Sequence, residues 1–390
     1  MQPLAWLDSL QGSGIRPGLG RMRALLKALG GPQRAYPSII VAGTNGKGST
    51  SATLASILDH SGYRTGFYTS PHLVEIRERW SIGGAMIVPP LLDECIEAIH
   101  AAGDRIGITP TYFEALTLIA FAAFARAACD VAVLEVGMGG RLDATNVVRP
   151  LAALITPIGF DHMEYLGRTI RKIAAEKAGV IHRGTIVLTS NDDPVILEVI
   201  ERRAAKFGNR FVHVIEEHDT PLAGAFQRRN AGLAVRAARE LMPLLPGISE
   251  DAIERGVART RWRGRLEHLR VRGKDIWIDG GHNAHAAAAI APYLDAHVPR
   301  PRLLVFGVMS DKDFGAVVAR LFPLFDRVIT TEPYPPRSMR ADAFEGATPI
   351  PDPEEALRAA LAAPERSVVV TGSLYLAGAA IAFFDKIAAP

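Results

Sequence analysis

The sequence predicts an α/β protein built on parallel sheets that helices cover on both faces. Short runs rich in β-branched residues alternate with helical segments along most of the 390 residues, a pattern typical of parallel sheets with crossover helices. These runs are apolar throughout, as expected for strands buried on both faces. The Pro- and Gly-containing segment 243–256 interrupts the alternation. We therefore expect a first domain over 1–260 and a second, smaller α/β domain over 261–390.

The elements of the first domain follow from local patterns. Strands are expected where β-branched and aromatic residues gather, at 38–43, 64–69, 130–136, 151–156, 185–190 and 210–214. Helices are expected where the pattern is helical, at 48–61, 91–102, 111–127, 168–178 and 226–242. The segment 70–90, with its charged run EIRERW, is expected to be irregular.

The second domain repeats the same alternation. Ser249 is a good N-cap for a short helix that begins with acidic residues and leads into this domain. Strands are then expected at LEHLRV, DIWIDGG, RLLVFGV, RVITTE and SVVVTGS, and helices at 284–296 and 313–322. The apolar stretches 115–125 and 374–384 are about half the ~20 residues of a membrane span. We expect both to form buried helices.

Composition and charge narrow the function classes. Hydrophobic residues make up 48% and charged residues 22% of the chain, as in ordinary globular proteins. The net charge of +3 is too small to indicate nucleic acid by itself. Cys95 and Cys129 are far apart and are interpreted as core thiols in a reducing compartment. Residues 1–14 show no secretory pattern. We expect a cytoplasmic monomer with neither nucleic acid nor membrane as a partner.

The segment AGTNGKGST, residues 42–50, lies between a predicted buried strand and a predicted helix. A glycine-rich turn at this place gathers backbone N–H groups and the positive end of the helix, which together form an anion site. Lys47 can reach nucleotide phosphates, and Ser49 or Thr50 can face a metal ion. The common phosphate-loop pattern fails twice, because Val41 replaces a glycine and Gly48 follows the lysine. Nucleotide binding is still favoured over a plain surface turn.

Polar side chains follow three predicted strands. Glu135 ends one strand, Asp161 and His162 follow the next, and Ser70 follows a third. The carboxyl ends of parallel strands form the crevice in which such sheets bind ligands. Magnesium prefers oxygen ligands, so His162 is the unusual member of this set. Together the four residues predict a metal site beside the loop.

Several patterns have an ordinary interpretation as well. On spacing alone, Lys177 and Glu176 indicate a solvated pair on a helix. His282 and His285 are spaced as zinc ligands can be, but no further ligand has matching spacing. The basic run 259–268 fits either a nucleic-acid patch or a segment that aims an arginine at phosphate, and its shortness favours the second.

A collinear set of motifs resembles the folylpolyglutamate synthase and dihydrofolate synthase family of the Mur-ligase superfamily. The resemblance covers roughly residues 35–380, and its motifs are GTNGKGS, YTSPHLVEIRER, TYFEALT, LEVGMGGRLDATN, ITPIGFDHMEYLG, EKAGVI, FQRRNA, RGRLE, DGGHN, MSDKD and VTGSLYL. GTNGKGS and GGRLDATN are the most specific of them. The order Lys-Gly-Ser in the loop matches this family.

The resemblance implies an N-terminal P-loop ATPase domain and a C-terminal Rossmann-like domain, with ATP held between them. The ATP-binding residues would be Gly43, Thr44, Asn45, Gly46, Lys47, Gly48, Ser49, Thr50, Asn230, Arg265 and Asp279. The ligands of two magnesium ions would be Ser70, Glu135, His162 and a carbamylated Lys177. A monovalent cation is a further candidate cofactor.

The resemblance also implies substrates and catalytic residues. The pterin side would be formed by Ser70, Pro71, His72, Thr111, Phe113, Arg141 and Asp143, while His282 and Asp279 would lie near the incoming glutamate. Lys47, Glu135, His162, Lys177, Asp279 and His282 would form the catalytic set. The chain departs from the family at Phe226, where histidine is common, and in DGGHNAH, where a proline is lost.

The implied reaction is ATP-dependent ligation of L-glutamate to dihydropteroate, to the γ-carboxylate of reduced folates, or to both. An acyl phosphate is the expected intermediate, and closure of the second domain would keep water away from it. The bifunctional enzyme is favoured. The alternatives are a Mur-type ligase for another carboxylate, such as a cell-wall peptide precursor, and a nucleotide-switch module without catalysis. TYFEALT and GGRLDATN argue against the first, and Asp279 with His282 against the second.

Overall fold

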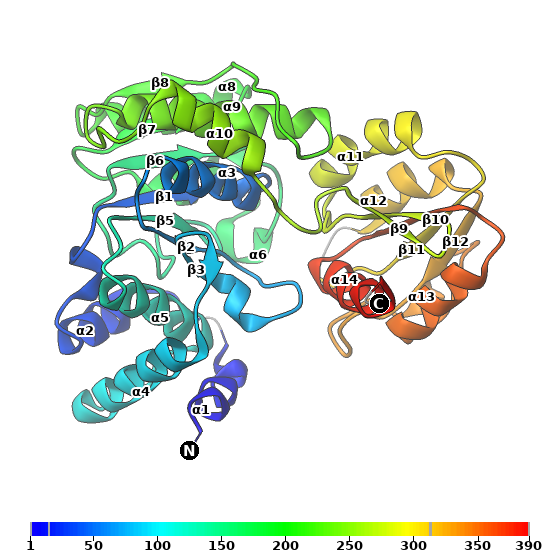
Figure 1. Cartoon of the computed structure of the whole chain (residues 1–390), viewed down its shortest axis with the longest axis horizontal. Coiled ribbons are helices and arrows are strands. Elements are labelled where there is room, and N and C mark those ends of the chain that lie inside the picture. Colours follow the sequence, from blue (N-terminus) through cyan, green and yellow to red (C-terminus); the bar gives the residue numbers. More distant parts are fainter. Residues whose placement is uncertain (1, 15, 312–313, 389–390) are drawn as a thin grey trace. The chain divides into compact units, whose positions relative to one another are not determined.

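The computed structural model describes residues 2–14, 16–311 and 314–388 (Figure 1). The described chain divides into two compact units. The first unit lies entirely before residue 261, and most of the second unit follows residue 260. Two short segments, 71–76 and 222–228, group with the second unit although they precede residue 261.

The first unit is built on a mostly parallel sheet. Its strand order is β4-β3-β2-β5-β1-β6-β7-β8. The bounds are β1 Ser38–Ala42, β2 Thr65–Tyr68, β3 Trp80–Ile82, β4 Ala85–Met86, β5 Val131–Glu135, β6 Ala152–Ile155, β7 Ile186–Thr189 and β8 Phe211–His213. Strand β1 is wholly buried and pairs in parallel with β5 and β6, so it lies in the middle of the sheet.

Helices pack around this sheet. Their bounds are α1 Pro3–Ser9, α2 Gly20–Ala28, α3 Lys47–His60, α4 Pro89–Ile106, α5 Tyr112–Arg126, α6 Met163–Leu166, α7 Ile170–Lys177, α8 Pro194–Ala205, α9 Ala225–Leu241 and α10 Glu250–Arg259. Helices α3 and α10 lie against each other (Figure 1), because a side chain at Gly256 would stand 2.4 Å from the Cα of Ile57. Ser249 caps α10 as predicted, accepting a hydrogen bond from the Ala252 amide.

The second unit has its own sheet, in the order β13-β12-β11-β14-β10-β9. Its strands are β9 Glu267–Val271, β10 Lys274–Ile278, β11 Arg302–Phe306, β12 Arg327–Thr330, β13 Thr348–Pro349 and β14 Ser367–Thr371. Its helices are α11 Ala284–His297, α12 Phe314–Leu321, α13 Pro353–Ala362 and α14 Leu374–Ala388. Only β9 in this sheet runs antiparallel among the described strands.

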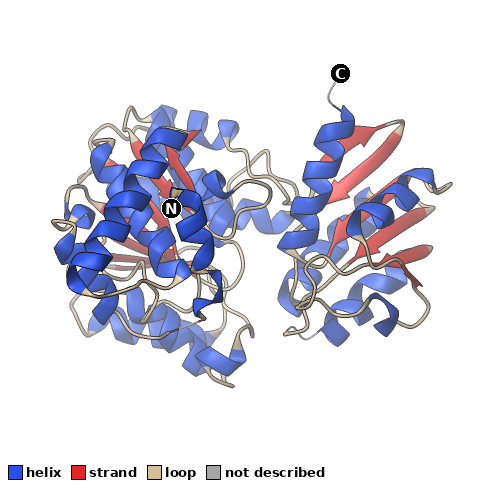
Figure 2. Cartoon of the chain, turned by 90° about the horizontal axis from the view of Figure 1, so that it is seen from below, coloured by secondary structure: helices blue, strands red, loops and turns tan. Residues whose placement is uncertain are grey.

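Helices cover both faces of the second sheet (Figure 2), and buried side chains of its strands alternate between two cores, one on each face. Ile276 and Ile278 of β10 pack into the core that contains residues of α13 and α14. Trp277, between them, packs with residues of α11 and α12 on the other face. Because successive strand residues point to opposite faces, a continuous apolar run supplies both cores, as the sequence predicts.

The α/β prediction is confirmed, with differences in detail. The segment 70–90 is not irregular throughout, because β3 and β4 form an antiparallel hairpin on the edge of the sheet. The prediction of a helix over 313–322 includes residue 313, which lies outside the described residues; α12 is described over Phe314–Leu321. The apolar stretches 115–125 and 374–384 form parts of α5 and α14. None of the described helices combines the length and the apolar character needed to cross a bilayer.

A buried arginine fastens the second sheet to its helices. The side chain of Arg302 is 1% exposed and donates hydrogen bonds to the carbonyl oxygens of Leu324, Leu294 and Val298. It also pairs with Asp295 at 2.8 Å. All of these acceptors are satisfied by one guanidinium group, whose planar fork of donors suits such a role.

We expect Arg302→Met to destabilise the protein by about 3 kcal/mol, because it leaves several buried carbonyl groups without a donor. The control is Arg358→Met, which removes the exposed pair with Glu354 and should cost below about 1 kcal/mol. Thermal unfolding followed by calorimetry measures both variants. Equal shifts in the two variants would contradict this role for Arg302.

Candidate active site

The loop between β1 and α3 leads directly into the N-terminus of a helix, the arrangement on which the predicted anion site depends. Gly46 adopts a left-handed conformation with φ of 86° and is the N-cap of α3, which begins at Lys47. The amides of Thr44 and Asn45 donate to the carbonyl oxygen of Pro157 at 3.0 and 3.2 Å. The loop is therefore held against the segment that follows β6, at the carboxyl edge of the sheet.

Two loop glycines are required by close contacts. A side chain at Gly43 would stand 1.8 Å from the Thr156 hydroxyl, and one at Gly46 would stand 2.4 Å from the side-chain oxygen of Asn230. Asn230, predicted to contact the nucleotide, thus lies against the loop. Its carbonyl also accepts a hydrogen bond from Thr50 at 3.4 Å.

Two lysines converge on this loop. The Lys47 amine donates to the Thr44 carbonyl at 3.0 Å, and the Lys177 amine donates to the Gly43 carbonyl at 2.5 Å. The Lys177 side chain is buried, so the interpretation of Lys177 and Glu176 as a solvated pair is wrong. Burial, assisted by the charge of Lys47, lowers the pKa of Lys177 to about 7. Asp161 and Asp143 act in the opposite direction on this pKa.

Glu135 meets the end of β2. Its carboxylate is buried and accepts a hydrogen bond from the Thr69 hydroxyl and one from the Ser70 amide at 3.4 Å. Ser70 and Glu135, both predicted as magnesium ligands, are therefore neighbours. Thr69 was not predicted, although its hydroxyl lies directly before Ser70 at a strand end.

His162 lies in a strained turn after β6. It adopts a left-handed conformation with φ of 49° at the start of α6, and its amide donates to Asp161 at 2.9 Å. Its ring nitrogen Nε2 lies 3.8 Å from the same carboxylate. Among the residues that the structure describes, no group of three His, Cys, Asp or Glu side chains is placed to hold a metal ion. The magnesium set, which includes a serine and a modified lysine, stays a prediction.

The loop after β5 is packed closely against the end of α7. Asp143 is buried and accepts from the amides of Met138 and Thr145 at 3.0 Å, and its burial raises its pKa. Arg141 pairs with Glu176 at 2.9 Å. Asn146 donates to the carbonyl oxygens of Arg141 and Gly179. These contacts connect the predicted pterin-side loop with the helix that carries Lys177.

The start of α5 faces the same loop. Thr111 is the N-cap of α5 and accepts from the Glu114 amide. A side chain at Gly137 would stand 2.3 Å from the ring of Phe113, so this ring lies directly on the loop backbone. Glu114, which sequence reasoning missed, completes a capping box with Thr111. The capping-box spacing T-x-x-E in TYFEALT was a signal for it.

The predicted residues of the second unit gather after β10. Asp279 is buried and accepts from the amides of Leu266 and Gly281 at 3.0 and 2.7 Å. Burial raises its pKa, and the charge of Arg265 opposes this shift. A ring nitrogen of His282 lies 3.0 Å from the Gly280 carbonyl. Pro71 and His72 belong to the 71–76 segment that groups with this unit.

The chain resembles named proteins over nearly its whole length. Residues 41–230 match the Mur ligase middle domain, and residues 264–374 match the glutamate ligase domain of Mur ligases. A dihydrofolate synthase/folylpolyglutamate synthase of Bacillus subtilis is 33% identical over 95% of this chain and 96% of its own length. The chain belongs to the dihydrofolate synthase/folylpolyglutamate synthase family of Mur ligases.

Solved structures of the family are similar to this chain over almost its whole length. The Escherichia coli FolC in complex with DHPP and ADP shares 30% identity and superposes with a TM-score of 0.90, covering 99% of this chain and 98% of that one. The Mycobacterium tuberculosis folylpolyglutamate synthase with ADP and AMPPCP shares 32% identity, with a TM-score of 0.88 and 98% of both chains covered. The present chain is therefore a ligase with the two-domain fold of Mur ligases.

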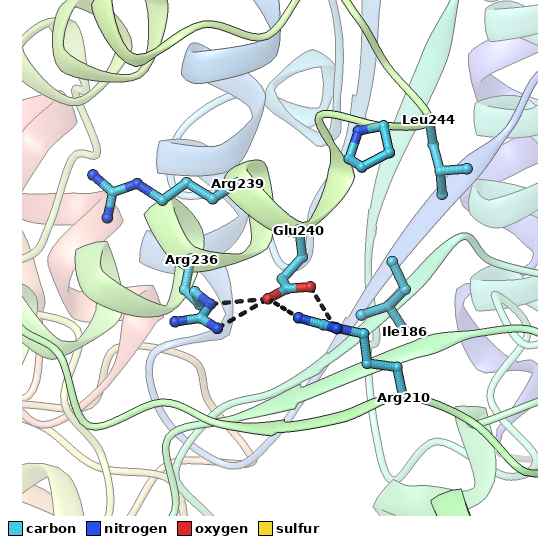
Figure 3. Close-up of a pocket in the computed structure, with 7 residues that line it drawn as sticks. Ile186, Arg210, Arg236, Arg239, Glu240 and Leu244 are labelled. Carbon is cyan, nitrogen blue, oxygen red and sulfur yellow. Dashed lines mark hydrogen bonds and ion pairs between the residues drawn. The ribbon is translucent and has the colours of Figure 1, made fainter.

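A hollow of about 580 Å³ lies in the first unit, away from the loop between β1 and α3 (Figure 3). It is lined by Ile186, Arg210, Arg236, Arg239, Glu240, Pro243 and Leu244. Arg210 and Arg236 both bind Glu240, and Arg239 pairs with Glu250. Ile186 begins β7, so the hollow is at the amino edge of the sheet, opposite to the loop. Its arginines are paired with carboxylates, so the hollow is a weaker candidate for an anion site than the loop.

The lowered pKa of Lys177 predicts a pH-dependent stability. Between pH 7 and the ordinary lysine pKa, the unfolded chain binds a proton at Lys177 that the folded chain does not hold. Stability from this residue therefore rises with pH across this window. From pH 7 to 9 in bicarbonate-free buffer, we expect the wild type to gain about 2 kcal/mol relative to Lys177→Met. Denaturant unfolding at several pH values measures this. Parallel pH profiles of the two proteins would contradict it.

Proposed function

We propose that this protein is an ATP-dependent ligase that joins L-glutamate to dihydropteroate and also to the γ-carboxylate of reduced folates. The observation that carries the proposal is the meeting of four features at one edge of the first sheet. These are the glycine loop, the amines of Lys47 and Lys177 that donate to its carbonyl oxygens, the Ser70–Glu135 contact, and the loop that holds Arg141. An anion site next to a pterin-side loop suits phosphoryl transfer from ATP to the carboxylate of a pterin substrate.

A carboxylate is a poor acyl donor, so the reaction begins with its activation. One carboxylate oxygen attacks the γ-phosphorus of ATP, and ADP leaves, which gives an acyl phosphate. The α-amine of L-glutamate then attacks the acyl carbon, loses a proton and displaces inorganic phosphate. The loop amides at the start of α3 and the Lys47 ammonium group stabilise the charge on the transferring phosphoryl group. Lys47 lies beside the loop for this role.

The donor set fits magnesium. The Ser70 and Glu135 side chains belong to neighbouring residues at the carboxyl edge, and both offer the oxygen ligands that magnesium prefers. A bound magnesium ion neutralises phosphate charge and orients the phosphates. We assign His162 to the same site because it follows β6, which pairs with β1 on the side opposite to β5, so it lies at the same carboxyl edge of the sheet.

Lys177 is proposed to carry a carbamate. A pKa of about 7 leaves roughly half of its amine neutral at neutral pH, and the neutral amine is the form that adds carbon dioxide with release of a proton. The product is a carboxylate in place of a second cation beside Lys47. That exchange would remove the repulsion between the two lysines and supply an oxygen ligand for the second magnesium ion.

The remaining residues are assigned to the pterin side or to the nucleotide and glutamate side. Thr111, Phe113, Arg141 and Asp143 form the pterin side in this proposal, with Phe113 presenting its ring beside Gly137. Asp279, Arg265 and His282 of the second unit serve the nucleotide and the incoming glutamate. Asp279 is held by two amide hydrogen bonds, so its position within that unit is well defined.

The test is ADP release by purified protein with ATP, magnesium and L-glutamate, given dihydropteroate or a reduced folate. We expect glutamate-dependent release with both acceptors and a loss of at least about 100-fold in kcat for Lys47→Ala, because transition-state charge loses a donor. The control is Lys206→Ala, a lysine just beyond α8 and far along the chain from the loop.

Three results would change the proposal. Release with dihydropteroate alone would remove the polyglutamylation activity, and release with neither acceptor would reject the folate assignment. Full activity of Lys47→Ala would reject the role of the loop in phosphoryl transfer.

A further inference from the structure

The first turn of α5 is held by a segment that lies almost 100 positions earlier in the chain. Arg21, near the start of α2, binds the Glu114 carboxylate with two nitrogens, Nε to Oε2 at 3.1 Å and Nη2 to Oε1 at 3.0 Å. The Glu114 side chain is 6% exposed. A two-pronged contact between guanidinium and carboxylate fixes direction as well as distance. The pair therefore sets where α5 begins.

Glu114 also binds the backbone at the start of α5. The oxygen that accepts from Arg21 Nε also accepts from the Thr111 amide at 2.8 Å. The Thr111 hydroxyl in turn accepts from the Glu114 amide at 3.3 Å. The Ser13 hydroxyl accepts from the next amide, that of Tyr112, at 3.0 Å. The first amides of a helix have no hydrogen-bond partner within it. At the start of α5, Glu114 accepts from the Thr111 amide and Ser13 accepts from the Tyr112 amide.

The same turn carries a predicted substrate contact. The Phe113 ring lies so close to Gly137 that a side chain there would come within 2.3 Å of it. Behind this turn, the Thr117 hydroxyl donates to the Phe113 carbonyl at 2.9 Å, and Tyr68 contacts Thr117 at 3.2 Å. The position of the Phe113 ring relative to Gly137 thus depends on where the first turn is held.

We infer that Arg21 is a positioning residue for the pterin acceptor, acting through Glu114 on the first turn of α5, which carries Thr111 and Phe113. This inference rests on the proposed function. It adds to that function a selective effect of one residue: loss of Arg21 impairs recognition of the pterin acceptor and spares recognition of ATP. Lys47, at the start of α3, donates to Thr44 of the loop, and Asn230 of α9 lies against Gly46. None of the contacts described for Arg21 involves these residues.

The test compares Arg21→Met with the wild type in the ADP-release assay, with dihydropteroate, ATP and L-glutamate varied in turn. We expect KM for dihydropteroate to rise about tenfold, while KM for ATP stays within about twofold. Quenching of protein fluorescence by dihydropteroate, without ATP, should show the same weakening. Arg21→Lys keeps the charge but loses the fork, so it should recover only part of the affinity.

A double-mutant cycle tests whether Arg21 acts through Glu114. Glu114→Gln retains an acceptor for the Thr111 amide and loses the ion pair, and it serves as the principal variant if Arg21→Met does not fold. The double variant should show little further rise in KM for dihydropteroate beyond that of the larger single effect. The control is Arg239→Met, which removes another arginine–glutamate pair of the same unit, and it should leave both KM values unchanged.

The outcomes separate this inference from the proposed function. If the wild type releases no ADP with either pterin acceptor, the proposed function fails and the inference fails with it. If the wild type is active and Arg21→Met raises KM for ATP and dihydropteroate by the same factor, or lowers only thermal stability, the inference alone is overturned. Additive effects of Arg21→Met and Glu114→Gln would overturn the route through Glu114.

Discussion

The hydrogen bond from the Lys177 amine to the Gly43 carbonyl joins the glycine loop to the end of α7. The backbone packs closely around this contact, both at the loop and at the end of α7. A side chain at Gly43 would collide with Thr156, and a side chain at Gly140 would stand 2.8 Å from the Lys177 carbonyl. Burial at this contact brings the pKa of Lys177 to about 7. Burial therefore favours the neutral amine of Lys177, whereas a lysine on the surface stays charged at neutral pH.

This contact also links the two halves of the proposed chemistry. In the proposed function the loop at Gly43 serves the nucleotide, and Arg141, bound to Glu176 beside Lys177, serves the pterin. Asp143 influences the pKa of both Lys177 and Tyr68, so its buried carboxylate lies within electrostatic reach of both. A ligase that activates a carboxylate must bring phosphate and acceptor together, and in this chain both sides are fastened to one helix end.

Much of the fold and part of the site could be predicted from the sequence. The apolar strands and the Lys-Gly-Ser loop are local signals, and they predicted the sheets and the loop at Lys47. The environment of Lys177 could not be obtained from spacing, because its neighbour Glu176 is equally compatible with a solvated pair. The contact of Arg21 with Glu114 joins residues far apart in the chain, and no local pattern predicts such a pair. The β3–β4 hairpin was missed because its strands are short and the adjoining run is charged.

In the proposed reaction this protein activates a carboxylate by phosphorylation. The most direct measurement uses dihydropteroate labelled with ¹⁸O in its carboxylate, together with ATP and L-glutamate, and analyses the released phosphate by mass spectrometry. An acyl phosphate transfers one carboxylate oxygen to phosphate, so each phosphate released from fully labelled substrate should carry one ¹⁸O atom. Phosphate without label, released together with the glutamate conjugate, would contradict the claim.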